Sequence, residues 1–319
     1  MELATGAFAL GTVSYGDRTF PVLLVEDERL VDLSAEFRSV AEVLEDWDAN
    51  VPALERLARE ADRSLALADV AVHAPFEPTQ IMQSGANYRQ HVIDLAVDRQ
   101  IGLKPGMSTE ELRAEATAMM DARIASGQPY VFLGAHSALT GPYDAIVLPP
   151  AGDHDWELEL AAVIGRAGRH VPVERALEHV AGYTICNDVT TRDLVHREDM
   201  PAIGSDWLRA KNAPTFLPTG PWVVPARFAG DPSDLRITLE LNGETMQDES
   251  TADMIFDVAR LVSYVSDGVG LRPGDLVLTG SPAGNGTHYN RYLRPGDVVE
   301  GTITGLGMQR NVCIAEVSA

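Results

Sequence analysis

Two glutamates separated by one leucine, Glu157 and Glu159, lie in a run of otherwise apolar residues that is typical of a buried β-strand. Side chains alternate faces along a strand, so both carboxylates project to the same side. Like charges on a covered sheet are unfavourable unless they share a proton, pair with an arginine or bind a cation. A third carboxylate, Asp188, ends another apolar run, and three oxygen ligands suit Mg²⁺, with Mn²⁺ and Ca²⁺ as alternatives. Because the chain carries 47 acidic residues, the pair also fits the solvated face of an amphipathic strand.

Four further residues could take part in chemistry. His91 and Asp94 would share one face of a helical turn, where the carboxylate makes the imidazole a better general base for water. The same spacing fits a surface ion pair. Arg192, four residues after Asp188, could grip an anionic substrate oxygen or serve as a structural partner of Asp188 or Asp193. Lys211 is one of two lysines in the chain and lies in a predicted loop.

The elements that must position these residues fall into two predicted domains. Residues 1–75 alternate short apolar runs with turns and show helical spacing over about 39–67, which predicts a small amino-terminal α/β domain. Residues 76–319 are rich in short predicted strands with frequent glycine and proline turns. This pattern favours an α+β, strand-rich catalytic domain built as a sandwich, roll or barrel over a doubly wound sheet.

Two helices are predicted within the second domain. Ser108 and Glu111 form a capping box at the start of a helix over 107–127, inside a lid-like excursion at about 91–130. Apolar residues at helical spacing predict another helix over 251–266.

Composition excludes several classes of function. The formal net charge of −22 disfavours nucleic acid as a partner, since its binding needs a positive field. No apolar run approaches the roughly 20 residues that cross a membrane. The first residues lack a basic segment, and the two cysteines are far apart, so we expect a cytoplasmic protein without disulfides.

Taken in order, several segments resemble the fumarylacetoacetate hydrolase family over about residues 80–317. The segments are Asn87-Tyr88-x-x-His91, Glu157-Leu158-Glu159, Asn187-Asp188-Val189-Thr190-x-Arg192, Lys211, Asn242-Gly243-Glu244 with Gln247, and Thr279-Gly280-x-Pro282. Each segment alone is weak evidence, whereas their shared order is specific. Family members often carry a lysine where this chain has Gly134, which calls recognition of the usual carboxylate-bearing substrate into question.

The resemblance implies a mixed β-roll or β-sandwich catalytic domain, a homodimer, and Mg²⁺ or Mn²⁺ on the three carboxylates named above. It implies that the His91–Asp94 dyad lies on a mobile lid and activates water. It also implies that Lys211 is catalytic and that a substrate pocket is lined by Tyr88, Arg192, Gln247 and Thr279.

The function expected from this resemblance is metal-dependent hydrolysis of a carbon–carbon bond in a β-diketone or acylpyruvate-like (2,4-dioxo acid) catabolite. Water activated by His91 would attack one carbonyl, Lys211 with Gln247 would stabilise the oxyanion, and a metal-bound enolate would leave. The alternative is a 2-oxo acid decarboxylase, hydratase or tautomerase on the same scaffold, which needs no attack by water. A ligand-binding protein without catalysis is the third hypothesis.

Overall fold

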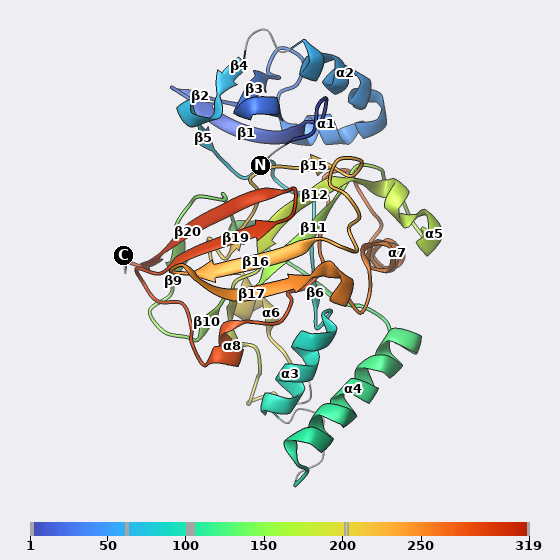
Figure 1. Ribbon diagram of the computed structural model, residues 1–319, viewed down its shortest axis with the longest axis vertical. Coiled ribbons are helices and arrows are strands. Elements are labelled where there is room, and N and C mark those ends of the chain that lie inside the picture. The colour runs from blue at the N-terminus through green and yellow to red at the C-terminus, as the bar shows by residue number, and fades with distance from the viewer. Residues whose placement is uncertain (1–2, 61–63, 100–105, 201, 203, 318–319) are drawn as a thin grey trace.

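The computed structural model describes residues 3–60, 64–99, 106–200, 202 and 204–317 of the chain. Figure 1 shows an amino-terminal unit at one end, a body of packed strands in the middle, and the helices α3 and α4 projecting at the other end. The strand-rich α+β class expected from the sequence is confirmed. In the described part of the chain, no helix has the length and apolar character that a membrane span requires.

The amino-terminal unit is a five-stranded antiparallel sheet of order β4-β3-β2-β1-β5, packed against two helices. The helical stretch expected over about 39–67 is present as two helices that end at Arg59, and its last part is wrong because residues 64–66 form strand β4. Ser39 caps the first helix, and the chain leaves helical geometry at Asp46 before the second begins. We keep the domain boundary near residue 75 as a proposal. The elements are β1 Ala9–Tyr15, β2 Arg18–Val25, β3 Arg29–Asp32, β4 Ser64–Ala66, β5 Ala71–Val72, α1 Val40–Glu45 and α2 Trp47–Arg59.

Two larger sheets form the body and pack face to face. The six-stranded sheet has the order β15-β12-β11-β18-β6-β7, and the five-stranded sheet has the order β17-β16-β19-β20-β9. They approach closely where a Cβ on Gly301 would lie 2.5 Å from Leu158 Cδ1, so this position requires glycine. Their strands are β6 Ile81–Gly85, β7 Tyr130–Leu133, β9 Ile146–Leu148, β11 Leu158–Ile164, β12 Val180–Asn187, β15 Val224–Pro225, β16 Arg236–Leu241, β17 Glu244–Ser250, β18 Leu276–Leu278, β19 Val298–Ile303 and β20 Gly307–Ala315.

Short strand pairs complete the body, and one hydrophobic cluster joins it to the amino-terminal unit. Leu10 and Leu23 of the amino-terminal sheet belong to the same buried cluster as Val163 and Leu276 of the six-stranded sheet. The short pairs are β10 His154–Asp155 with β13 Thr190–Thr191, and β8 Leu139–Thr140 with β14 Leu217–Pro218.

The helices of the body match the sequence expectations in part. Helix α4 spans Thr109–Ser126 and has the predicted capping box, which confirms that helix. The start predicted at residue 251 is wrong, because Asp257 caps α7, which runs over Val258–Gly268. Residues 100–105 of the predicted lid lie outside the described residues. The other helices are α3 Arg89–Arg99, α5 Val173–Ala176, α6 Trp207–Lys211 and α8 Gly286–Tyr289.

Candidate metal centre and active site

Glu157, Glu159 and Asp188 meet where strand β11 begins and strand β12 ends. Glu157 immediately precedes β11, and Asp188 immediately follows β12, its antiparallel neighbour. The backbone N–H of Asp188 donates to the carbonyl of Glu157 at 2.9 Å, which fixes the two residues side by side. Each of the three residues offers a carboxylate oxygen within 4.8 Å of the other two, and all three are buried.

Lys211, at the end of helix α6, reaches into this group. Its Nζ donates to Glu157 Oε2 and to Asp188 Oδ2, both at 2.6 Å. Burial acts against the charge of the ammonium group, but Asp188 and Glu157 more than offset it and raise the pKa of Lys211. The lysine is therefore charged at neutral pH and holds two of the carboxylates together.

Arg192 forms a second buried ion pair beside the group. Its Nη2 donates to Glu157 Oε1 at 2.6 Å and its Nε donates to Asp155 Oδ2 at 2.7 Å. Its structural partners are thus Asp155 and Glu157, in place of the Asp188 and Asp193 suggested by the sequence. Because both carboxylates are held in a fixed geometry, Arg192 orients Glu157.

The charges of the site do not balance. Four buried carboxylates (Asp155 and the three above) face two cations among the described residues, the buried Lys211 and the partly buried Arg192, which leaves two negative charges. The imbalance falls on Glu159, whose carboxylate accepts a hydrogen bond from Gly280 N at 2.7 Å and has no ion pair among the described residues. Burial and then Asp188 raise the pKa of Glu159, and burial raises that of Asp188 to about 6.

A divalent cation fits this donor set. It supplies the two missing positive charges, and hard cations such as Mg²⁺ prefer carboxylate oxygens. Arg192 and Lys211 more than offset the burial of Glu157 and lower its pKa, so this donor stays ionised. Glu157, Glu159 and Asp188 are therefore the residues that would hold a metal ion.

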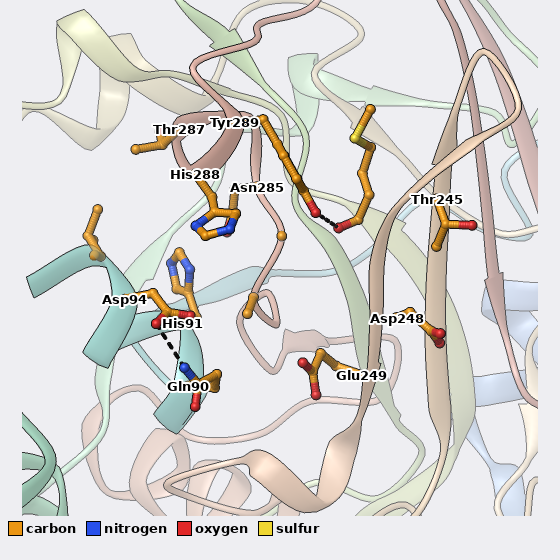
Figure 2. Close-up of a pocket in the computed structure, with 14 residues that line it drawn as sticks. Gln90, His91, Asp94, Thr245, Asp248, Glu249, Asn285, Thr287, His288 and Tyr289 are labelled. Carbon is orange, nitrogen blue, oxygen red and sulfur yellow. Dashed lines mark hydrogen bonds between the residues drawn. The ribbon is translucent and has the colours of Figure 1, made fainter. Parts of the chain in front are cut away.

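His91 and Asp94, on helix α3, line a cavity (Figure 2). Its wall also includes Asn285, which donates a hydrogen bond to Glu157. Burial lowers the pKa of His91, so its imidazole is neutral at pH 7. In the part of the chain that the structure describes, no hydrogen bond joins His91 to Asp94. Asp94 Oδ1 instead accepts from Gln90 Nε2 at 2.8 Å and from Arg113 Nη1 at 2.9 Å.

The remaining predicted substrate residues are buried around the site. Gln247 is fully hydrogen-bonded, because its Oε1 accepts from Leu158 N at 3.1 Å and its Nε2 donates to Ser281 Oγ at 2.9 Å. Thr279 Oγ1 donates to the carbonyl of Leu160 at 2.9 Å, and Tyr88 is fully buried. These bonds give Gln247 and Thr279 a structural role, and the substrate contacts of all three residues stay predictions.

Sequence reasoning missed three residues that hydrogen-bond to the carboxylates or to Arg192. Asp155 continues the alternation of Glu157 and Glu159 by one step, so the strand pattern itself could have revealed it. Gln83 Nε2 donates to Asp188 Oδ1 at 2.6 Å, and Asn285 Nδ2 donates to Glu157 Oε1 at 3.2 Å. The residues of these two pairs are 105 and 128 positions apart in the chain, so no local sequence pattern predicts the contacts.

Gly134 leaves the space that lets Gln83 reach Asp188. A Cβ at residue 134 would lie 2.8 Å from Gln83 Oε1 and 2.9 Å from Ile81 Cγ2. We expect Gly134→Ala to displace the Gln83 amide and to weaken metal binding by about tenfold or more, as loss of a bond to a metal ligand commonly does.

Calorimetric titration with Mg²⁺ measures this effect. Gly268→Ala is the matched control, since a Cβ there meets nothing within 4 Å. In a protein that already carries Gln83→Ala, adding Gly134→Ala should lower the Mg²⁺ affinity little further. An undiminished loss in that background would show that the glycine acts by another route.

Residues 80–314 match the family described as Fumarylacetoacetate (FAA) hydrolase C-terminal. The 2,4-didehydro-3-deoxy-L-rhamnonate hydrolase of Sphingomonas sp. (strain SKA58) is 45% identical over 187 residues, which are 57% of this chain and 64% of that protein. The mitochondrial oxaloacetate tautomerase FAHD2A of Bos taurus is 41% identical over 184 residues, 57% of each chain. The matched segment thus spans less than two thirds of both relatives.

A solved structure is similar over nearly the whole chain. The fumarylacetoacetate hydrolase of the psychrophilic Exiguobacterium antarcticum is 29% identical, with a TM-score of 0.74. The match covers 97% of this chain and 100% of the other. The similarity therefore includes the amino-terminal unit that the family match leaves out.

Proposed function

Because this chain belongs to the fumarylacetoacetate hydrolase family, a family of enzymes, we propose that it hydrolyses a carbon–carbon bond in a 2,4-dioxo acid or related β-diketone. One observation carries the proposal. The three carboxylates of the candidate metal centre keep two uncompensated negative charges directly beside a cavity lined by a neutral histidine. A cation bound by these carboxylates would therefore lie close to a candidate base.

The proposed metal ligands are Glu157, Glu159 and Asp188, with Mg²⁺ as the expected ion and Mn²⁺ or Ca²⁺ as alternatives. When bound, such an ion polarises a carbonyl and stabilises the negative charge of an enolate. Arg192 and Lys211 hold Glu157 from both of its oxygens, which orients this ligand before any substrate binds.

His91 is the proposed general base. Its neutral imidazole can accept a proton from water in the cavity and pass it to the departing carbon. Asp94 is held by Arg113 and Gln90, so we propose that it positions helix α3 in this state of the protein. Lys211 carries the ammonium nearest to the carboxylates and is the proposed stabiliser of the oxyanion. The homodimer and the cytoplasmic location expected from the sequence remain predictions.

The second candidate function is isomerisation or decarboxylation of a 2-oxo acid. It is favoured by the missing hydrogen bond between His91 and Asp94 within the described residues, since enolisation needs no attack by water. The similarity to an oxaloacetate tautomerase also supports it.

A substrate panel tests the two functions. Protein freed of metal by a chelator should be inactive, and added Mg²⁺ should restore cleavage of acetylpyruvate to acetate and pyruvate, which NMR detects. If the protein interconverts the keto and enol forms of oxaloacetate but does not cleave acetylpyruvate, it is a tautomerase. Release of CO₂ from oxaloacetate would identify a decarboxylase.

A further inference from the structure

The cavity beside the candidate metal centre has a volume of about 310 Å³. Helix α3 forms one wall with His91 and Asp94, and the segment around helix α8 forms another with Asn285 and Thr287 (Figure 2). Strand β17 closes the third side. Because Asn285 also donates to Glu157, the cavity shares a wall with the metal centre. It is the place for the part of a substrate that extends beyond the reacting carbonyl groups.

The charged side chains that line this cavity are mostly acidic. Asp94, Asp248 and Glu249 line it, whereas no lysine or arginine does so among the described residues. Arg113 neutralises Asp94, and Arg236 neutralises Asp248. Figure 2 shows Glu249 extending from β17 toward the helix that carries His91.

Glu249 is the lining carboxylate that lacks a partner. In the described part of the chain, it makes neither a hydrogen bond nor an ion pair. The pKa of Glu249 is raised by burial and then by the nearby carboxylates Asp253, Asp248 and Asp94. The negative electrostatic potential around Glu249 therefore disfavours additional negative charge. A carboxylate at the far end of a substrate would meet this field without a cation to receive it.

Asn285 offers a second acceptor without a partner. Its Nδ2 donates to Glu157 Oε1 at 3.2 Å and to the carbonyl of Trp156 at 3.5 Å, which fixes the orientation of the amide. Its Oδ1 has no hydrogen-bond partner among the described residues, although only 1% of the side chain is exposed. Because this oxygen is itself buried, the free acceptor that a ligand in the cavity can reach is Glu249.

We infer that this cavity selects 2,4-dioxo acids whose far end carries hydroxyl groups and no negative charge. A hydroxyl group donates to the free acceptor, Glu249, and carries no charge for Glu249 to repel. The inference rests on the proposed function, because it assumes that the dioxo acid head lies at Glu157, Glu159 and Asp188. It goes further by assigning the tail specificity to Glu249.

Three compounds that share the 2,4-dioxo acid group and differ at the far end test this substrate preference. They are 5,6-dihydroxy-2,4-dioxohexanoate, its hydroxyl-free analogue propionylpyruvate, and succinylpyruvate, which ends in a carboxylate. We expect kcat/KM with Mg²⁺ to be about tenfold higher for the dihydroxy acid than for propionylpyruvate, as one or two added hydrogen bonds provide. We expect succinylpyruvate to be about tenfold poorer than propionylpyruvate.

Substitutions of Glu249 assign the effect to this residue. Relative to propionylpyruvate measured with the same variant, Glu249→Lys should raise kcat/KM for succinylpyruvate by about tenfold and lower it for the dihydroxy acid. Glu249→Gln should relax the discrimination against succinylpyruvate and keep a preference for hydroxyl groups, since the amide still accepts. Glu174→Lys makes the same charge change on the exposed surface of helix α5 and should alter none of the three.

The outcomes separate the inference from the proposed function. If propionylpyruvate is cleaved but succinylpyruvate or an amino-terminated analogue is preferred to the dihydroxy acid, the inference is overturned and the proposed function stands. If none of the compounds is cleaved, the proposed function fails. Calorimetric affinities of the same compounds for the Mg²⁺-loaded protein and for Glu249→Lys then decide the tail preference on their own.

Discussion

Replacing Glu159 by glutamine should make the metal-free protein more stable and the Mg²⁺-dependent enzyme nearly inactive. The carboxylate is buried, and its pKa is raised by burial and by Asp188, so its ionised form opposes folding at neutral pH. A neutral amide of the same shape removes this repulsion and should raise the free energy of unfolding by about 1–3 kcal/mol at pH 7. Below pH 4.5 the carboxylate is protonated in both states, so the gain should shrink there.

Activity should change in the opposite direction. Glu159 supplies one of the three proposed ligands, and a bound metal ion stabilises developing charge by several kcal/mol. Each 1.4 kcal/mol corresponds to about tenfold in rate, so we expect a loss on the order of 1000-fold in kcat/KM. A purely structural Glu159 would lower stability and activity together.

Denaturant unfolding in a chelator, repeated with Mg²⁺, distinguishes these cases. Mg²⁺ should stabilise the unsubstituted protein, because a ligand that binds the folded state favours it, and should hardly affect Glu159→Gln. Glu174→Gln, at an exposed position on helix α5, serves as the control and should respond like the unsubstituted protein. Full activity of Glu159→Gln in excess Mg²⁺ would remove this residue from the set of ligands.

The pairing of Glu157 with Glu159 illustrates what the sequence contains. Strand alternation places the two side chains on one face, and an apolar environment predicts that they are covered, both from neighbouring residues alone. The capping box of Ser108 and Glu111 is local in the same way, and it located helix α4. Asp188 was identified in the same local way, because it ends another apolar run.

What the sequence missed depends on contacts between distant segments. Gln83 reaches Asp188 because β6 belongs to the same sheet as β11 and β12, with β18 between β6 and β11. Asn285 reaches Glu157 because the segment before α8 folds back onto the residue that precedes β11. Arg192 was expected to pair with a nearby acid, yet its partners are on the adjacent strand segment at Asp155 and Glu157. Several carboxylates lie near Arg192, and the packing of the folded chain determines which of them it pairs with. The periodicity of a single segment contains no information about that packing.

His91→Ala should separate hydrolysis from enolisation. If His91 accepts the proton of the attacking water, its loss should lower hydrolysis of a 2,4-dioxo acid by about 100- to 10,000-fold, the usual contribution of a general base. Mg²⁺ affinity should change by less than about twofold, because His91 makes no bond to the proposed ligands within the described residues. Enolisation needs only the polarised carbonyl and a base, and water can replace His91 there at lower cost.

Three readouts on one sample make this prediction decisive. Product formation measures hydrolysis, exchange of the C3 protons for deuterium measures enolisation, and calorimetry measures Mg²⁺ binding. His170→Ala, which removes an exposed histidine paired with Asp267, is the control and should leave all three unchanged. Loss of hydrolysis with exchange retained assigns His91 to the activation of water. Equal loss of both would make His91 the base for enolisation and favour the tautomerase, because that reaction uses the same proton transfer without a water attack.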